Sequence, residues 1–533
     1  METIRKLRSP MTAHAVLARR NRRLVTITAL LLGGAALLAA VLGGCGGGSA
    51  VTNPPVVPTT TPILTATDVQ NVAQAAAGSV DSDSMVVAVV DRSGVVLAVY
   101  RKPSAPATAT GNFGAAIDAN DLAVALARTA AYFSNNQAPL SSRTVRFISG
   151  IHFPPGVTNA GNAALYGIEN TNRGCTLTTN FLPGKNISPS LALGGGFGPG
   201  IITGKVDLSD SDPTVVNPGG VPIFKDGVVV GGVGVAGVPP DVAEFAAFSA
   251  VATNGFGPSP APPGVVFIDG IALPFVSQTT RPSGVNAGTA NGTFVVGPLA
   301  SAGQPPEGDL IAPAVGPIGG LTAAEVKQIL DNAEAEANLT RAVIRLPLGS
   351  RARMVISVAD LDGTIIGLRR MTDATVFSID VAATKARNMV YFNSSARTAA
   401  DLNQVPMTTA VTNRTISFGA QPLYPPGIDG SNPGPFFNLY QQDTLNPCTQ
   451  GFQTGAPNAN KSGIVFFPGS AGLFRNGVLV GGLGVSGDGV EQDDFVTAAG
   501  AAGFLAPDAV RADQLLVNSV RLPYWKFPRN PTD

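Results

Sequence analysis

Histidine, cysteine and charged residues are scarce in this sequence. Its 533 residues include two histidines and three cysteines, and only 13% of them are charged. His14 lies in the N-terminal segment, so the rest of the chain has His152 alone. One histidine cannot form a two-histidine zinc site, and no Ser-His-Asp or Cys-His arrangement can be argued from it. The sequence has no basic stripe of the kind that nucleic-acid-binding proteins carry. We therefore expect no catalytic triad, no metal site and no nucleic-acid partner.

The N-terminus has the layout of a signal peptide. Residues 19–23 are basic apart from one asparagine, and residues 24–42 form an apolar run. The run ends in Leu42-Gly43-Gly44-Cys45, which resembles a bacterial lipobox, where the cysteine becomes the acylated first residue of the mature protein. This layout predicts a signal peptide over residues 1–44 and a lipid anchor on Cys45.

The residues that follow bear on location and charge. Residues 45–63 are rich in Gly, Pro and Thr, which predicts a tether. Gly46 is not the aspartate associated with inner-membrane retention, so we expect the protein in the cell envelope, at the outer membrane facing the periplasm. A plain transmembrane anchor is the alternative, because the apolar run is about long enough to span a bilayer.

Residues 1–44 hold seven Lys/Arg and one Glu, so the remainder has 28 basic and 34 acidic residues and a net charge of −6. That charge does not attract phosphate backbones or anionic lipids.

The two remaining cysteines occupy similar places in the two halves of the chain. Gly174-Cys175-Thr176 and Pro447-Cys448-Thr449 are the two contexts. An exported protein folds in an oxidising compartment, so a disulfide between Cys175 and Cys448 is one interpretation. Two unpaired, partly buried thiols are the other.

One segment occurs twice and organises the sequence. It reads GGVPIFKDGVVVGGVGVAG at 219–237 and GSAGLFRNGVLVGGLGVSG at 469–487. Asp226-Gly227 and Asn476-Gly477 favour the type I′ turn, in which both central residues have positive φ, so each copy predicts a β-hairpin. Both copies end in G-x-G-x-x-G. Because these glycines end a hairpin rather than the first strand of a βαβ unit, we interpret them as sites of close helix-on-sheet packing and not as a dinucleotide site.

The duplication extends beyond the hairpin. Met85 to Asp91 corresponds to Met354 to Asp360, and similar matches place the first domain at residues 64–276 and the second at 321–527. The connection over 277–320 is rich in Gly, Pro, Ala and Ser. Each repeat predicts helix, strand, strand, helix, long loop, strand, strand, helix. Strands joined by tight turns are antiparallel, so the predicted fold class is α+β, with two tandem α/β/α sandwiches, each an antiparallel sheet covered by helices.

These motifs resemble the GlcG/HbpS family of haem-binding or haem-degrading domains. The second repeat carries Asp380, Lys385-Ala386-Arg387, Gly484-Val485-Ser486-Gly487 and Glu491-Gln492-Asp493. The resemblance implies a profilin-like sandwich that oligomerises, a pseudo-dimer of the two repeats, and haem as the ligand. It leaves out the insertions at about 137–218 and 396–468.

The first repeat matches the family pattern less fully. It keeps Arg128 opposite Arg387, but it has Leu126 where the pattern has a lysine, and it has no E-Q-D sequence. A surviving ligand pocket is therefore expected in the second repeat.

Three residues are candidate ligand-binding groups. His152 is the candidate axial ligand if haem is bound through an imidazole, although a lone loop histidine is more often structural. Lys385 and Arg387 are candidates for a carboxylate such as a haem propionate. They lie two residues apart on a helix and do not share one face squarely. The alternative is that one faces solvent and the other pairs with a carboxylate such as Asp380 or Asp360.

We consider three functions. The first is an envelope-anchored lipoprotein that binds a small molecule, with haem as the ligand implied by the resemblance. The second is an envelope protein-protein interaction lipoprotein whose ancestral pocket is defunct and whose insertions form the partner surface. The third is an enzyme acting on haem or a small carboxylated metabolite. The scarcity of histidine makes this third function less favoured.

Overall fold

The computed structural model divides the chain into two compact units, residues 1–59 and 60–533. It describes residues 61–111, 116–149, 165–168, 171, 217–258, 266–268, 271–428, 430–446, 449–452 and 462–532. The predictions for Cys45, His152, Cys175 and Cys448 lie outside the described residues. No helix in the described ranges is long and apolar enough to cross a membrane.

The first repeat and the connection after it have the predicted order of elements, with further short strands and one extra helix. The elements are α2 (Ala66–Gly78), β1 (Val86–Asp91), β2 (Val96–Arg101), β3 (Thr108–Thr110), β4 (Ala116–Asp118), α3 (Ala119–Phe133), α4 (Ser142–Ser149), β5 (Gly220–Lys225), β6 (Val228–Ala236), α5 (Pro240–Thr253), β7 (Val266–Ile268), β8 (Ile271–Leu273) and β9 (Thr293–Val296).

The second repeat also has the predicted order of elements, with two extra helices, and one further strand precedes it. Its elements are β10 (Gly308–Ile311), α6 (Ala323–Ala337), β11 (Val355–Ala359), β12 (Ile365–Arg370), α7 (Phe377–Phe392), α8 (Asn413–Gly419), α9 (Phe437–Leu445), β13 (Ser470–Arg475), β14 (Val478–Ser486), α10 (Val490–Gly500), the short 3₁₀ helices Asp508–Val510 and Ala512–Gln514, β15 (Leu516–Val517) and β16 (Val520–Arg521).

Local sequence signals account for the start of each repeat and for the hairpin turns. Thr65 caps α2 and Thr322 caps α6, each through a reciprocal capping box with the acidic residue three positions later. Asp226 and Asn476 have φ values of 54° and 51°, and the glycine after each also has positive φ. This confirms the two predicted type I′ hairpins.

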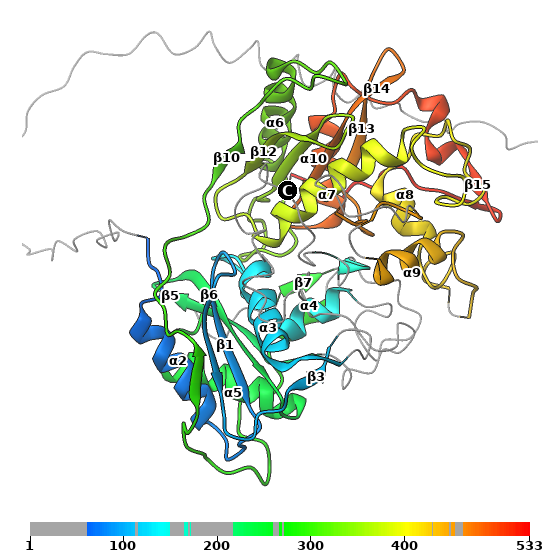
Figure 1. The fold of residues 1–533 in the computed structure, drawn as a ribbon. Helices are drawn as coiled ribbons and strands as arrows, with labels where there is room; N and C mark the ends of the chain where they lie inside the picture. Colours follow the sequence, from blue (N-terminus) through cyan, green and yellow to red (C-terminus); the bar gives the residue numbers. More distant parts are fainter. Residues whose placement is uncertain are drawn as a thin grey trace, which may run out of the picture. The chain divides into compact units, whose positions relative to one another are not determined.

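The two main sheets have the same arrangement of strands in space, but their edge strands differ in chain order: β9 follows its repeat, whereas β10 precedes its repeat. Their strand orders are β5-β6-β1-β2-β9 and β13-β14-β11-β12-β10, and all the pairings are antiparallel. The connection over 277–320 therefore does more than link the repeats, because β9 forms the edge of the first sheet beside β2. In the same way β10 forms the edge of the second sheet beside β12 (Figure 1). Its composition hid these strands, because they are short and separated by proline and glycine.

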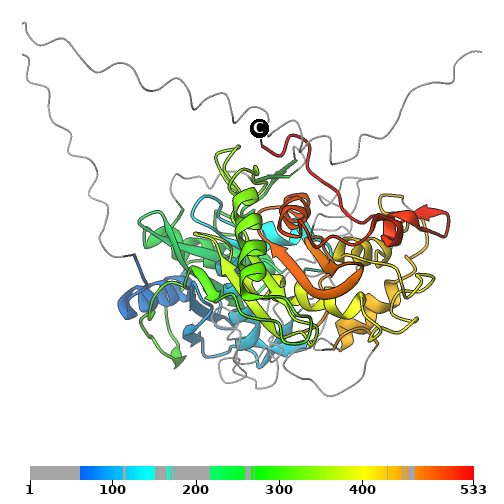
Figure 2. The same cartoon turned by 90° about the horizontal axis from the view of Figure 1, so that it is seen from above.

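Helices cover both faces of each sheet, as the fold class predicted. In β1, Val87 and Val89 pack in the cluster that contains α2 and α5, whereas Val86, Ala88 and Val90 pack in the cluster that contains α3. This alternation follows from the two-residue period of a strand. In the second repeat α7 packs on β14 and β11, while α6 and α10 pack together on the other face (Figures 1 and 2).

The first two glycines of each G-x-G-x-x-G sequence allow a helix to lie directly on the sheet. A Cβ atom at Gly232 or Gly234 would collide with backbone carbonyl oxygens of α3, and one at Gly482 or Gly484 would collide with those of α7. The packing interpretation of these glycines is therefore confirmed.

The two repeats contact each other through unlike surfaces. Phe133, at the end of α3, stacks on Phe377, at the start of α7, with ring centroids 4.0 Å apart. The Val376 N–H donates to the Tyr132 carbonyl oxygen at 3.0 Å. Phe392, the counterpart of Phe133, packs instead in the cluster formed around the second insertion. The stacking contact between the repeats is therefore not isologous.

Candidate functional site

Lys385 lies inside the second repeat, on the face of α7 that packs against the sheet. Its Nζ atom donates to the Val485 carbonyl oxygen at 2.7 Å and lies 3.0 Å from Oδ2 of Asp493 in α10. The ammonium group also lies 4.7 Å from the centre of the Phe467 ring. Lys385 has no exposed surface, and Asp493 is almost fully buried. The ammonium group is therefore enclosed, and the partner is neither Asp380 nor Asp360.

Burial shifts both members of this pair toward their neutral forms. Burial raises the pKa of Asp493 to about 7, although Lys385 opposes the shift. Burial likewise lowers the pKa of Lys385, against the influence of Asp493. Oδ1 of Asp493 has no hydrogen-bond partner in the described part of the chain. One oxygen of the Asp493 carboxylate thus contacts the Lys385 ammonium group, while the other is buried without a hydrogen bond from the described residues.

The first repeat lacks both members of the pair. Leu126 stands where α7 has Lys385, and Ala243 stands where α10 has Asp493, as the hydrogen bonds from their amides to Pro239 and Gly489 show. Leu126 and Ala243 are both buried. An ion pair in one repeat is therefore replaced as a unit by two apolar side chains in the other.

Arg387 fastens α7 to the β11–β12 turn and lies apart from the Lys385 pair. Its Nε donates to the Gly363 carbonyl oxygen at 2.8 Å, just as Arg128 donates to Gly94 at 2.9 Å in the first repeat. Neither Nη1 nor Nη2 of Arg387 has a hydrogen-bond partner among the described residues. Burial lowers the pKa of Arg387 to about 10, while Asp380 and Asp362 oppose the shift. The guanidinium group therefore stays charged at neutral pH.

Both repeats contain a second buried ion pair, which was not predicted from the sequence. Arg143 in α4 pairs with Glu244 in α5, with 2.7 Å between Nε and Oε1. Arg414 in α8 pairs in the same way with Asp494 in α10. The sequence does contain an Arg-Thr pair at corresponding places, in Ser142-Arg143-Thr144 and in Asn413-Arg414-Thr415. Both segments lie in stretches that we interpreted as insertions, so the arginines were not expected to form equivalent ion pairs.

The sequence has two pairs of neighbouring carboxylates, and they have different roles in the structure. Asp360 accepts hydrogen bonds from the backbone amides of Ile318 and Gly319, and Asp362 accepts one from Thr364, so both stabilise turns. Asp493 and Asp494 lie in the first turns of α10, and each pairs with its own basic residue. Among the described residues no group of three or more His, Cys, Asp or Glu could hold a metal ion.

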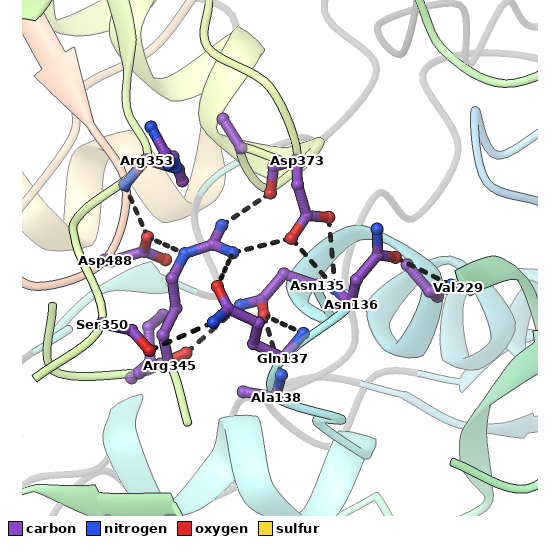
Figure 3. A network of polar contacts seen from close by, with 12 residues as sticks. Asn135, Asn136, Gln137, Ala138, Val229, Arg345, Ser350, Arg353, Asp373 and Asp488 are labelled. Carbon is purple, nitrogen blue, oxygen red and sulfur yellow. Dashed lines mark hydrogen bonds and ion pairs between the residues drawn. The ribbon is translucent and has the colours of Figure 1, made fainter. Parts of the chain in front are cut away.

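A polar network joins the two repeats near the end of β14. Arg345 lies between Asp488 and Asp373, and its Nη1 is 2.7 Å from Oδ2 of Asp373 (Figure 3). Asp373 also accepts a hydrogen bond from the Asn136 backbone amide of the first repeat at 3.2 Å. Nη1 of Arg345 donates to Oε1 of Gln137 at 3.1 Å. Burial raises the pKa of Asp488, although Arg345 opposes the shift.

Comparison with known proteins gives one family match. Residues 321–502 match the family model described as haem degrading protein HbpS-like. No curated protein matches the chain. The chain is similar to the crystal structure of a PduOC:haem complex, with 22% identity, a TM-score of 0.22, and coverage of 39% of this chain and 99% of that one.

It is also similar to Klebsiella pneumoniae protein ORFY, with 20% identity, a TM-score of 0.23, and coverage of 34% of this chain and 90% of that one. These low TM-scores carry no functional argument. The duplication rests instead on the matching strand orders of the two sheets. The second repeat is thus similar to HbpS-like haem-degrading proteins, and the family match does not extend to residues 64–276.

Proposed function

We propose that this protein is an envelope-anchored lipoprotein that binds a small molecule, with haem as the first ligand to test. The observation that carries the proposal is the HbpS-like match over residues 321–502. The lipid anchor on Cys45 and the location at the outer membrane rest on the N-terminal sequence.

The described residues fit the propionates of haem better than its iron. Propionates are carboxylates, and the charged guanidinium group of Arg387 has two terminal nitrogens without a hydrogen-bond partner in the described ranges. Lys385 does not fit this role, because Asp493, Val485 and Phe467 already surround its ammonium group. No described residue is a histidine, so an axial imidazole from this chain would have to come from His152. When bound, haem would supply a redox-active iron, and Arg387 would orient it through a propionate.

A haemin titration of residues 46–533 tests the proposal. We expect a saturable Soret shift at micromolar haemin, which His152→Ala abolishes or moves. Arg387→Met should weaken binding about tenfold to a hundredfold without moving the Soret band, since it removes a charged hydrogen bond and not the axial ligand.

Arg128→Met, the equivalent change in the first repeat, is the matched control and should leave haemin binding unchanged. Circular dichroism would confirm that each variant is folded. A titration of the wild-type protein without any saturable change would refute haem as the ligand.

An interaction role for the second insertion is the second candidate, because that insertion exposes large apolar side chains. Met407, Ile428 and Leu445 are 41%, 54% and 79% exposed. The insertion also packs around Leu439 and Tyr440 in one cluster with Met389 and Phe392 of α7, so deleting it would expose part of the core. Leu445→Glu is the sharper test, and loss of a co-purifying envelope protein in that variant alone would favour this role.

A further inference from the structure

Arg92 lies in the turn between β1 and β2 and is a buried cation. It is 2% exposed, and neither Nη1 nor Nη2 has a hydrogen-bond partner among the described residues. Burying a charged guanidinium group costs several kcal/mol unless an opposite charge or hydrogen-bond acceptors compensate it. Such an arrangement therefore requires an explanation.

The turn itself does not need an arginine. Asp91 shapes the turn by accepting hydrogen bonds from the backbone amides of Ser93 and Val95, both at 2.9 Å. Its second oxygen accepts a hydrogen bond from the Ser301 hydroxyl at 3.2 Å. In the second repeat the residue after the corresponding aspartate is Leu361. The same turn thus forms with an apolar residue at this position.

The charges that act most on Arg92 come from the second repeat and from Glu307, just before β10, and they do not neutralise it. Burial is the main cause that lowers the pKa of Arg92 to about 9; Arg370 and Arg345 add to this effect, while Asp373 and Glu307 oppose it. The two positive charges of the other guanidinium groups approximately balance the two negative charges of the carboxylates. The positive charge of Arg92 is therefore not compensated by these groups.

Both nearby carboxylates are already engaged. Asp373 binds Arg345 and the Asn136 amide. Glu307 accepts a hydrogen bond from the Asp373 amide at 2.8 Å and lies 3.6 Å from Nη1 of Arg370. Neither Asp373 nor Glu307 therefore forms an ion pair with Arg92.

We propose that Arg92 anchors an oxyanion-binding site at the contact between the two repeats, which takes a small carboxylate or phosphate. Two terminal nitrogens of a guanidinium group present parallel N–H donors, and these match two oxygens of a carboxylate or phosphate. A bound anion would compensate the buried charge and tie the first repeat to the second. The proposal does not depend on haem binding.

The test uses the full chain purified in detergent, titrated calorimetrically with inorganic phosphate and with acetate. We expect saturable binding of at least one anion. The melting temperature should rise with that anion at constant ionic strength, because a ligand at about 100 times its Kd raises the folded-to-unfolded ratio about 100-fold. Preference for phosphate or for acetate identifies the class of ligand.

Two variants isolate Arg92. Arg92→Leu introduces the residue found at this place in the second repeat, so it should fold, melt in chloride no lower than the wild type, and lose the anion response. Arg92→Lys keeps the charge but loses the paired donors, and its anion affinity should fall about tenfold.

Arg369→Leu is the control, because it removes an arginine that is already paired with Asp309, Asp331 and Glu334. Its anion response should equal that of the wild type. Absence of binding with both anions, or an unchanged response in Arg92→Leu, would overturn the proposal.

Discussion

Replacing Lys385 and Asp493 together by Leu and Ala should be far less harmful than replacing either one alone. The first repeat already contains this apolar combination, as Leu126 and Ala243, at the same places in the fold. Removing one member of a buried ion pair typically costs about 3–5 kcal/mol, whereas replacing the whole pair by well-packed apolar groups is often neutral. The double-mutant cycle should therefore give a coupling of at least about 3 kcal/mol.

The two single variants should respond to pH in opposite directions. The pKa of Asp493 is raised from 3.8 to about 7 in the folded protein, so its contribution to stability is present below pH 3.8 and is lost as the pH rises through 7. Lys385→Leu removes the group that holds this pKa down, so that variant should lose stability most steeply as the pH rises past neutrality. The pKa of Lys385 is lowered in the folded protein, so Asp493→Ala should lose stability as the pH falls.

Urea unfolding followed by circular dichroism at pH 5 and pH 8 measures all four members of the cycle. The double variant should show neither of the two pH trends. If it is as unstable as the sum of the single variants at both pH values, the two groups do not compensate each other, and the interpretation of the pair as one structural unit is wrong.

Two other variants test one contact within the second repeat and one between the repeats. Arg414→Met leaves the Asp494 carboxylate buried without its ion-pair partner, and the free energy of unfolding should fall by about 3–5 kcal/mol in urea titrations; an unchanged midpoint would contradict this. Phe377→Ala removes the ring that stacks on Phe133 and should cost about 3–5 kcal/mol. In calorimetry it should also separate the melting of the two repeats, whereas Phe392→Ala, within the second repeat, should lower one transition without separating them.

Short-range signals predicted most of the fold. The turn sequence Asp226-Gly227 fixes positive φ at two residues, and the Thr65 capping box fixes the start of α2, so both depend on neighbours along the chain. The glycines of β6 and β14 also behaved as expected, because the alternative required a βαβ unit that the element order excluded. The fold class follows from such local signals and from their repetition.

Long-range partners could not be predicted in the same way. The carboxylate that pairs with Lys385 lies 108 residues away in α10, and the sequence offered Asp380 and Asp360 as nearer choices. The pairing depends on which face of α7 meets the sheet, and charge alone does not reveal that face. Strands β9 and β10 were missed for a related reason: an edge strand needs only one partner and few apolar residues.

Comparison of the repeats changes where a ligand should be sought. Lys385 appeared to mark a surviving anion site, because the first repeat lacks it. The structure shows that its partner Asp493 is missing from the first repeat as well, which is the behaviour expected of an internal ion pair that is present or absent as a unit. Groups that bind an external anion should instead keep unsatisfied donors. Arg387 and Arg92 have such donors within the described ranges, and they are therefore the better candidates for contact with a ligand.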